Sequence, residues 1–300
     1  RRLNVAGTLT FANSSGYDLY IRDNGNLNIT ATGLVDTASN GFIYLQEGLN
    51  GSGSGSGTVF AAITSATGGR INVASGSVLN INADTATGNR IGGNFELTGE
   101  GALQLVSGAI AISDASAFTG TGPLRIAGST LATNAATSFA NLELNSGTLA
   151  GSANSTIDRL TWNGGSMTGT AAVTLAGTAT ISSVPGYKDS SRDIRITGNT
   201  TIANQGGYAL RLNNARLYTE AGGSLTLVDG ALITHTGTGR IDNGGLMIKT
   251  GATPLSLAVP LTNAGTLRVE EGSLTVSAFP VNAGRLTILA GASLITGNAN

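Results

Sequence analysis

The sequence predicts an all-β protein built as a parallel β-helix, a solenoid of stacked coils with about 19 to 21 residues each. The first observation is the pattern GxΦxΦxxG, where Φ is an aliphatic residue. The second is a repeat near the C-terminus, in which residues 263–281 are followed by the similar residues 282–300. The third is a high density of glycine and β-branched residues, which disfavours long helices. The pattern begins at Gly69, Gly101, Gly223, Gly244, Gly265 and Gly284.

Each copy of the pattern predicts a short strand with one buried face, because its aliphatic residues alternate with polar ones. Leu267 and Val269 illustrate this, with Arg268 between them. The glycine that opens each copy allows either a positive φ or a close approach of the backbone at a corner between strands. An antiparallel sandwich also has short alternating strands, but we would not expect it to repeat one glycine-anchored pattern at near-constant length.

The strand signals run along the whole chain, from residues 7–11 to the last repeat, and residues 140–147 keep the same step with alanine in the first glycine place. The apolar side chains buried by one coil cannot offset the conformational entropy that its backbone loses on folding, so coils must stack. We therefore expect a single continuous β-helix over residues 1–300. Loop excursions are expected near 50–57, where GSGSGSG occupies 51–57, and at 184–193, VPGYKDSSRD. Neither end carries a cap, which predicts a segment of a longer or a polymeric protein.

Composition excludes several classes of function. Sixteen basic and seventeen acidic side chains give a net charge of −1, which argues against a nucleic-acid partner. No apolar stretch has the roughly 18 residues needed for a transmembrane segment. Cysteine is absent, and this absence in a polar chain rich in glycine suits export, because a disulfide formed early would hinder passage through a narrow pore.

The coils NAGTLRVEEGSLTVSAF and NAGRLTILAGASL resemble those of bacterial surface and secreted proteins of the autotransporter and filamentous-haemagglutinin-like type. The resemblance covers most of the chain, and it is a repeat grammar rather than a unique motif. It implies a right-handed parallel β-helix that is exported and serves as a stalk, an adhesin or a carrier of small loops. It also implies an extracellular or cell-surface location.

The sequence shows no catalytic, cofactor-binding or metal-binding constellation. His235 is the only histidine, so a histidine-based metal cluster cannot form within one chain, and we expect it at a surface strand position. Trp162 falls where an aliphatic core residue is expected, and we predict core packing over a sugar platform. Nucleophile motifs, calcium-binding repeats and phosphate loops are also missing.

The densest local charge marks the one candidate ligand or partner loop. Polysaccharide lyases and glycosidases also use β-helices, with clustered charges and aromatic platforms, so an enzyme is the rival hypothesis. The alternative reading of the loop is a solvated corner whose charges keep it soluble. The candidate residues are Tyr187, Lys188, Asp189, Arg192, Asp193 and Arg195.

These observations favour a non-enzymatic extracellular structural or adhesive β-helix without a cofactor. Its expected partners are other copies of the chain, stacked end to end or laterally, or a glycan or protein of a host or cell surface. Two alternatives stay open. One is a polysaccharide-degrading enzyme on the same scaffold, and the other is a self-assembling extracellular filament.

Overall fold

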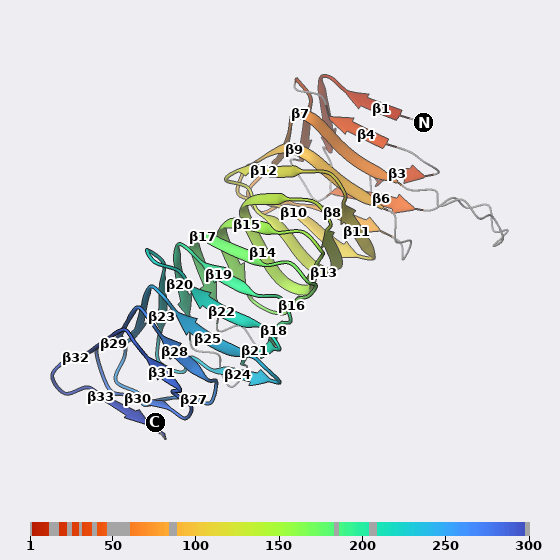
Figure 1. Ribbon diagram of the computed structural model, residues 1–300. Coiled ribbons are helices and arrows are strands. Elements are labelled where there is room, and N and C mark those ends of the chain that lie inside the picture. Colours follow the sequence, from red (N-terminus) through yellow and green to blue (C-terminus); the bar gives the residue numbers. More distant parts are fainter. Residues whose placement is uncertain are drawn as a thin grey trace. The chain divides into compact units, whose positions relative to one another are not determined.

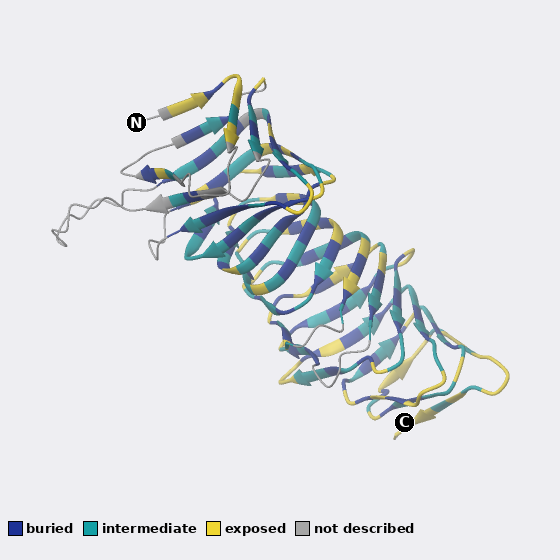
Figure 2. Cartoon of the chain, turned by 180° about the vertical axis from the view of Figure 1, so that it is seen from behind, coloured by how far each residue is buried: buried dark blue, intermediate teal, exposed yellow. Residues whose placement is uncertain are grey.

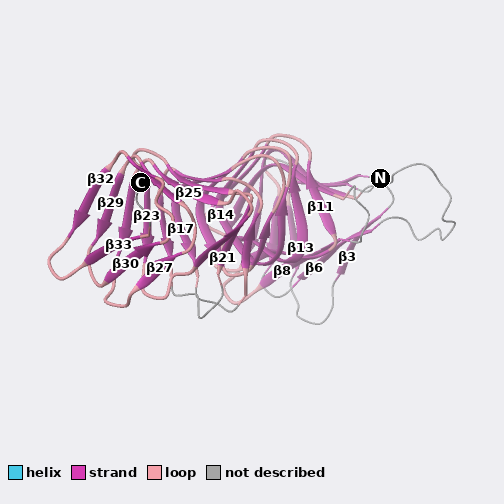
Figure 3. Cartoon of the chain, turned by 60° about the horizontal axis from the view of Figure 1, so that its bottom comes forward, coloured by secondary structure: helices cyan, strands magenta, loops and turns pink. Residues whose placement is uncertain are grey.

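The computed structural model describes residues 2–11, 18–22, 26–29, 32–37, 41–46, 61–83, 89–182, 186–203 and 209–297. Within these ranges the chain is all β, without a helix (Figure 3). Strands of successive coils pair in parallel, with a spacing of about 21 residues per turn. The predicted parallel β-solenoid is therefore confirmed. The chain divides into two compact units, Arg1–Ser155 and Thr156–Asn300, and each is described by itself.

In the first unit each coil contributes three strand positions, and equivalent strands of successive coils form three parallel ladders (Figure 1). The long strands β7, β9, β13 and β14 each turn a corner and take part in more than one ladder. The strands are β1 (Arg2–Val5), β2 (Thr8–Phe11), β3 (Asp18–Arg22), β4 (Asn26–Ile29), β5 (Leu34–Thr37), β6 (Gly41–Gln46), β7 (Ala62–Val73), β8 (Val78–Ala83), β9 (Arg90–Thr98), β10 (Ala102–Ser107), β11 (Ala109–Ile112), β12 (Ser116–Gly120), β13 (Leu124–Thr133) and β14 (Thr137–Ala150).

The second unit also stacks strands at three positions of the coil. One ladder runs from β17 through β19, β22, β25 and β28 to β31, and a second runs from β17 through β20, β23, β26 and β29 to β32. The third position holds β16, β18, β21 and β24 and then a separate sheet of β27, β30 and β33. The bounds are β15 (Ser155–Trp162), β16 (Gly165–Met167), β17 (Val173–Ile181), β18 (Lys188–Ser190), β19 (Ile194–Ile196), β20 (Asn199–Ile202), β21 (Leu210–Asn213), β22 (Arg216–Thr219), β23 (Ser224–Leu227), β24 (Ile233–Thr236), β25 (Arg240–Asn243), β26 (Leu246–Lys249), β27 (Leu255–Leu257), β28 (Leu261–Asn263), β29 (Thr266–Val269), β30 (Ser273–Val276), β31 (Val281–Asn282), β32 (Arg285–Ile288) and β33 (Ser293–Thr296).

The core is a set of columns in which equivalent aliphatic residues stack from coil to coil. Leu79, Leu103, Leu124 and Leu142 are ladder neighbours, and each is at most 1% exposed. The stretch of chain between neighbours shortens at each step of this column, so coil length varies while the register holds. Corner segments absorb the difference, because only the strand positions have to match for the backbone ladder and the dry core to form.

One core column of the first unit is aromatic. The rings of Phe95, Phe118 and Phe139 stack with centroids 5.5 and 5.4 Å apart, and each side chain is 1% exposed. Parallel in-register strands place identical side chains above one another, which favours such stacking. The sequence carried this signal, because each phenylalanine follows the previous one by close to the predicted coil length.

A ladder of asparagine amides joins three successive coils of the second unit. Asn243 donates from Nδ2 to Asn263 Oδ1 at 2.7 Å, and Asn263 donates in the same way to Asn282 Oδ1 at 2.7 Å. Asn243 and Asn263 are at most 1% exposed. The carboxamide of Asn263 therefore both accepts and donates within the stack, where an unpaired amide would be costly.

The opening glycine and the closing glycine of the repeated pattern are required for different structural reasons. A Cβ on Gly265 would lie 2.1 Å from the carbonyl oxygen of Gly245, and one on Gly284 would lie 2.1 Å from that of Gly265. These opening glycines are required by the close approach of successive backbones. The closing glycines, Gly272 and Gly291, adopt φ values of 61° and 81°, which favour glycine. Gly272 is limited by space as well, because a Cβ there would lie 2.5 Å from the carbonyl oxygen of Ala252.

The pattern that begins at Gly244 predicted the wrong face of its strand. Leu246 and Ile248 were expected inside, but both are half-buried on the outer face, while Met247 and Lys249 are fully buried. Two consecutive glycines, Gly244 and Gly245, displace the pattern by one residue. A slip of one residue moves every side chain of a strand to the opposite face.

Candidate functional site

The candidate ligand loop lies at a corner of the second unit. Its six candidate side chains do not form one cluster. Tyr187 precedes β18, which itself holds Lys188 and Asp189. Arg192 and Asp193 form the connection to β19, which carries Arg195. Of the stretch 184–193, residues 184 and 185 lie outside the described residues, as does the whole of 51–57.

Two of the candidate cations point inward. Lys188 is fully buried and donates from Nζ to the carbonyl oxygen of Gly186 at 2.9 Å. Arg192 is 1% exposed and donates from Nε to the carbonyl oxygen of Ala171 at 2.6 Å. Burial lowers the pKa of Lys188 and lowers the pKa of Arg192 to about 10. Both side chains hold the backbone at a corner and do not reach the surface.

Tyr187 and Asp189 face outward and meet an arginine of the next coil. Arg211, in β21, donates from Nε and Nη2 to the two carboxylate oxygens of Asp189, with Nη2 2.6 Å from Oδ2. Its guanidinium lies 4.0 Å from the centroid of the Tyr187 ring. The hydrogen bond to Asp189 raises the pKa of Arg211, with further contributions from the charges of Asp189 and Tyr187. This Tyr–Arg–Asp group is joined by a bidentate ion pair and a ring contact, and it is half-exposed.

The two remaining candidates connect to neighbouring coils. The Asp193 carboxylate accepts a hydrogen bond from the backbone N–H of Arg216 at 2.8 Å. Arg195 donates from Nε to Glu220 Oε1 at 2.6 Å. Neither partner was a candidate in the sequence, because neighbours in the stack are separated by a full coil of the chain.

A second Tyr–Arg–Asp group lies on the adjoining strands β22 and β25. The Arg216 guanidinium is 4.7 Å from the Tyr218 ring centroid, and its Nε is 3.4 Å from Asp242 Oδ2. Arg240 donates from Nε to the same oxygen at 3.1 Å. Ladder register pairs Arg216 with Arg240 and Tyr218 with Asp242, one coil further along the chain. No local motif marks these residues, and only the strand register could have revealed them.

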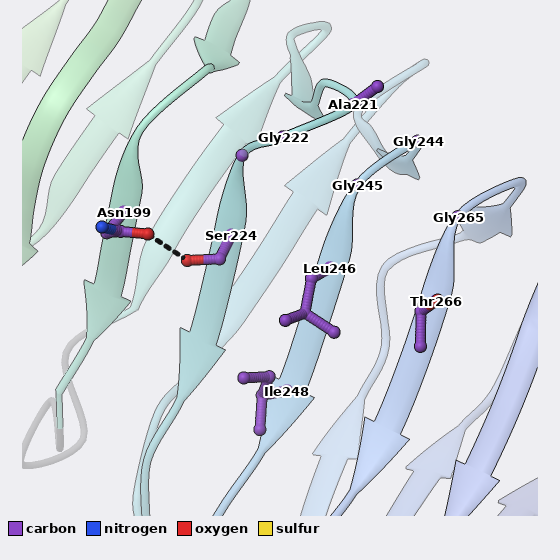
Figure 4. Close-up of a pocket in the computed structure, with 11 residues that line it drawn as sticks. Asn199, Ala221, Gly222, Ser224, Gly244, Gly245, Leu246, Ile248, Gly265 and Thr266 are labelled. Atoms are coloured by element: carbon purple, nitrogen blue, oxygen red, sulfur yellow. Dashed lines mark hydrogen bonds between the residues drawn. The ribbon is translucent and has the colours of Figure 1, made fainter.

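A shallow hollow of about 600 Å³ lies on the outer face of the second unit (Figure 4). Its lining includes glycines of successive coils, and Leu246 and Ile248 of β26 also line it. Ser224 donates to Asn199 Oδ1 at 2.7 Å along its edge. The displaced pattern at Gly244 thus creates an apolar spot on an otherwise polar strand face.

The single histidine and the single tryptophan occupy structural positions. Trp162 is fully buried and donates from Nε1 to the carbonyl oxygen of Gly164 at 3.1 Å, which confirms the predicted core role. His235 lies half-buried in β24, and its Nδ1 is buried without a hydrogen-bond partner among the described residues. The described ranges hold no group of three or more His, Cys, Asp or Glu side chains suited to a metal ion.

The fold and the geometry of this surface define a parallel β-solenoid in which several outer charges are paired between coils. No protein-family model matches the sequence, and neither the curated proteins nor the solved structures contain a match to it. In the described part of the chain, no helix is long and apolar enough to cross a membrane.

Proposed function

We propose that this chain is a non-enzymatic structural or adhesive β-solenoid of a bacterial cell surface or the extracellular space. It acts there as a stalk, a passenger segment or a fibre subunit. The observation that carries the proposal is that polar side chains on the outer faces are hydrogen-bonded from one coil to the next. These side-chain hydrogen bonds stiffen the stack, because bending the stack would break them together with the backbone hydrogen bonds.

The first unit contains a continuous chain of these outer contacts. Gln104 donates to Asn80 Oδ1 at 3.0 Å, and Arg125 donates to Gln104 Oε1 at 3.3 Å and to Glu143 Oε2 at 2.5 Å. Side-chain hydrogen bonds therefore link four successive coils, in addition to the backbone ladder. Stiffness of this kind suits a rod that displays a surface away from a cell.

The charged surface of the second unit favours display over catalysis. Glycoside cleavage requires carboxyl groups that exchange protons with a substrate. Asp189 is held by Arg211, Asp242 by Arg216 and Arg240, and each of these pairs crosses between coils or lies along a strand. The two half-exposed Tyr–Arg groups offer ring faces and N–H donors that suit a glycan or a protein surface.

The repeated sequence pattern of residues 263–300 also supports a more specific proposal. By its resemblance to such repeats, the chain would be a passenger or stalk segment of the autotransporter or filamentous-haemagglutinin-like type. The proposed partners are a glycan or protein of a host or cell surface, or other copies of the chain. No cofactor is needed for either role.

The decisive experiment offers the purified chain a panel of acidic and neutral polysaccharides and measures both retention and cleavage. We expect retention of at least one glycan without release of oligosaccharides. Tyr187→Ala should weaken retention, while Tyr20→Ala should not, and the two tyrosines are matched in exposure at 48% and 46%. Release of oligosaccharides would establish the enzymatic alternative instead.

The location is tested separately by immunogold labelling of intact cells of the source organism. We expect label at the outer surface or on released material. Label that appears only after the cells are permeabilised would contradict an extracellular role.

A further inference from the structure

A recess lies on the outside of the first unit, where β9 turns a corner at Gly92 and Gly93. We call it the corner recess. Its lining comes from four successive coils, namely from β4, β7, β9 and the connection between β11 and β12. Its volume of about 630 Å³ is in the range of pockets that hold small molecules. The corner recess belongs to the first unit, whereas both Tyr–Arg–Asp groups belong to the second.

The recess arises because the corner of β9 is shorter than the corners of both neighbouring coils. The ends of residues 65–69 in β7 pair with the ends of residues 93–95 in β9, so β7 has two additional residues there. On the other side, the ends of residues 111–117 pair with the ends of residues 90–94, so this coil also has two additional residues. The two longer corners flank the short one and leave a hollow over it.

Gly92 keeps the recess open, although the backbone does not require glycine at this position. A Cβ on Gly92 would have one contact within 4 Å, at 3.2 Å from Ser116 Oγ. Gly93 differs, because its φ is 103° and its Cβ would overlap the carbonyl oxygen of Ser65. The ladder neighbour of Gly92 is Thr64, so the adjacent coil carries a side chain at the equivalent place. The missing side chain of Gly92 therefore serves the recess and not the corner.

Hydrogen bonds fix the walls of the recess on both sides of β9. Ser116 is buried, and its Oγ donates to the carbonyl oxygen of Asp114 at 2.8 Å and accepts from the N–H of Gly93 at 2.9 Å. On the side of β7, Thr64 donates from Oγ1 to Asn28 Oδ1 at 3.3 Å. The walls are thus preorganised, which lowers the entropic cost of binding a ligand.

One positive and one negative side chain line the recess. Arg90 lies outward on β9, along which buried and outward residues alternate (Figure 2). Its ladder neighbours are Ala62 and Ala111, so no long side chain stands beside it in the ladder. The exposed carboxylate of Asp114 has no ion-pair partner among the described residues. The other outward groups described in the lining are hydroxyl, amide, methyl and glycine groups, and none is aromatic.

We propose that the corner recess binds a uronic acid residue of an acidic glycan. Arg90 pairs with the carboxylate of the sugar, and Asp114 accepts hydrogen bonds from its vicinal hydroxyl groups. The chemistry matches, because a uronic acid carries its carboxylate and its vicinal hydroxyls on opposite sides of the ring. This inference rests on the proposed function in taking a glycan as the ligand, but it assigns a separate site.

Titration calorimetry of the full chain with two trisaccharides tests the role of the carboxylate. The probes are trigalacturonate and α-1,4-galactotriose, in which a hydroxymethyl group replaces each carboxylate. We expect trigalacturonate to bind at least about 10-fold more tightly, as a charge-assisted hydrogen bond provides. Arg90→Gln should abolish this preference. Arg70→Gln should preserve it, because Arg70 is an exposed arginine of the neighbouring strand β7 that does not line the recess.

A second pair of variants tests the recess itself. Gly92→Thr gives β9 the residue that its ladder neighbour Thr64 already carries, and it should abolish binding of both trisaccharides by filling the hollow. Asn94→Thr is the matched control, because Asn94 is exposed on the same strand but does not line the recess. Circular dichroism of all variants establishes that they are folded.

Three results would overturn the proposal: no binding of trigalacturonate, equal affinity for the two trisaccharides, or binding that survives Gly92→Thr. Tyr187→Ala separates this inference from the proposed function and should leave trigalacturonate binding unchanged. Polysaccharide retention that depends on Tyr187 but not on Arg90 would support the proposed function and exclude the recess as a glycan site. Trigalacturonate binding in the recess without any polysaccharide retention would instead count against the proposed adhesive function alone.

Discussion

Single glycines control how closely the coils approach one another. The missing Cβ of Gly265 would meet the carbonyl oxygen of Gly245, while a Cβ on Gly291 would meet no atom within 4 Å. The first position is limited by space, and the second is limited only by its positive φ. The two glycines of the repeated pattern should therefore differ in their tolerance of alanine.

Gly265→Ala should lower the free energy of unfolding by about 3 kcal/mol or more, because the added methyl group meets backbone that cannot move without breaking the ladder. Gly291→Ala should cost about 1 kcal/mol, the strain of a positive φ. Urea unfolding followed by circular dichroism measures both. Equal effects would mean that close approach does not limit the corner.

Buried cations give the stability a specific dependence on pH. The pKa of Lys188 in the folded chain lies below its ordinary value of 10.5 because of burial. Between the two values the unfolded chain binds more protons than the folded chain, so the free energy of unfolding rises with pH.

Lys188→Met should remove this contribution. The free energy of unfolding of the wild type relative to Lys188→Met should increase as the pH rises towards 10.5, by at most about 1.4 kcal/mol per pH unit. Parallel urea titrations at several alkaline pH values measure the difference. A difference that falls with rising pH would contradict the assignment.

At the level of the strand, register decides which residues form the core. In β26 the tandem glycine displaces the pattern, so Met247 lies between Leu225 and Leu267 in the core column and Ile248 lies outside. The neighbouring strands β23 and β29 impose this choice through the backbone ladder. Hydrophobicity within β26 alone does not determine it, because both faces carry apolar residues.

A matched pair of substitutions tests this register. Met247→Thr should lower the free energy of unfolding by about 2–4 kcal/mol, since it leaves a cavity and buries a hydroxyl. Ile248→Thr should change it by less than about 1 kcal/mol, because that position is half-exposed. Thermal unfolding of the two variants provides the comparison. A larger effect of Ile248→Thr would mean that Ile248, and not Met247, faces the core.

Strand register also explains which surface residues the sequence revealed. The run from Tyr187 to Arg195 was visible as a local cluster of charge, but its partners Arg211 and Glu220 were not. Hydrogen-bonded neighbours in a solenoid are one coil apart, and the coil length varies among the described ladders. A periodicity that is only approximate cannot assign such pairs residue by residue.

For the chain as a solenoid, stability is a sum over neighbouring coils. Interior coils have a neighbour on each side, whereas the β31–β33 coil pairs with one neighbour among the described residues. In such arrays the terminal repeats open most readily.

Hydrogen exchange of a polypeptide of residues 1–300 should therefore be faster in peptides covering residues 281–297 than in peptides covering β22 and β23. Mass spectrometry resolves these segments. Equal protection of the two segments would contradict stacking as the source of stability.

The amino-acid sequence alone was sufficient to predict the fold class, the approximate coil length and most inward positions. These properties follow from local chemistry, namely alternating aliphatic residues and glycines at regular intervals. Contacts between coils were needed to establish the burial of Lys188 and Arg192, the inner face of β26, the amide ladder through Asn263 and the pairing of surface charges. Each of these depends on residues that meet across a full coil, where small differences in coil length set which side chains lie together.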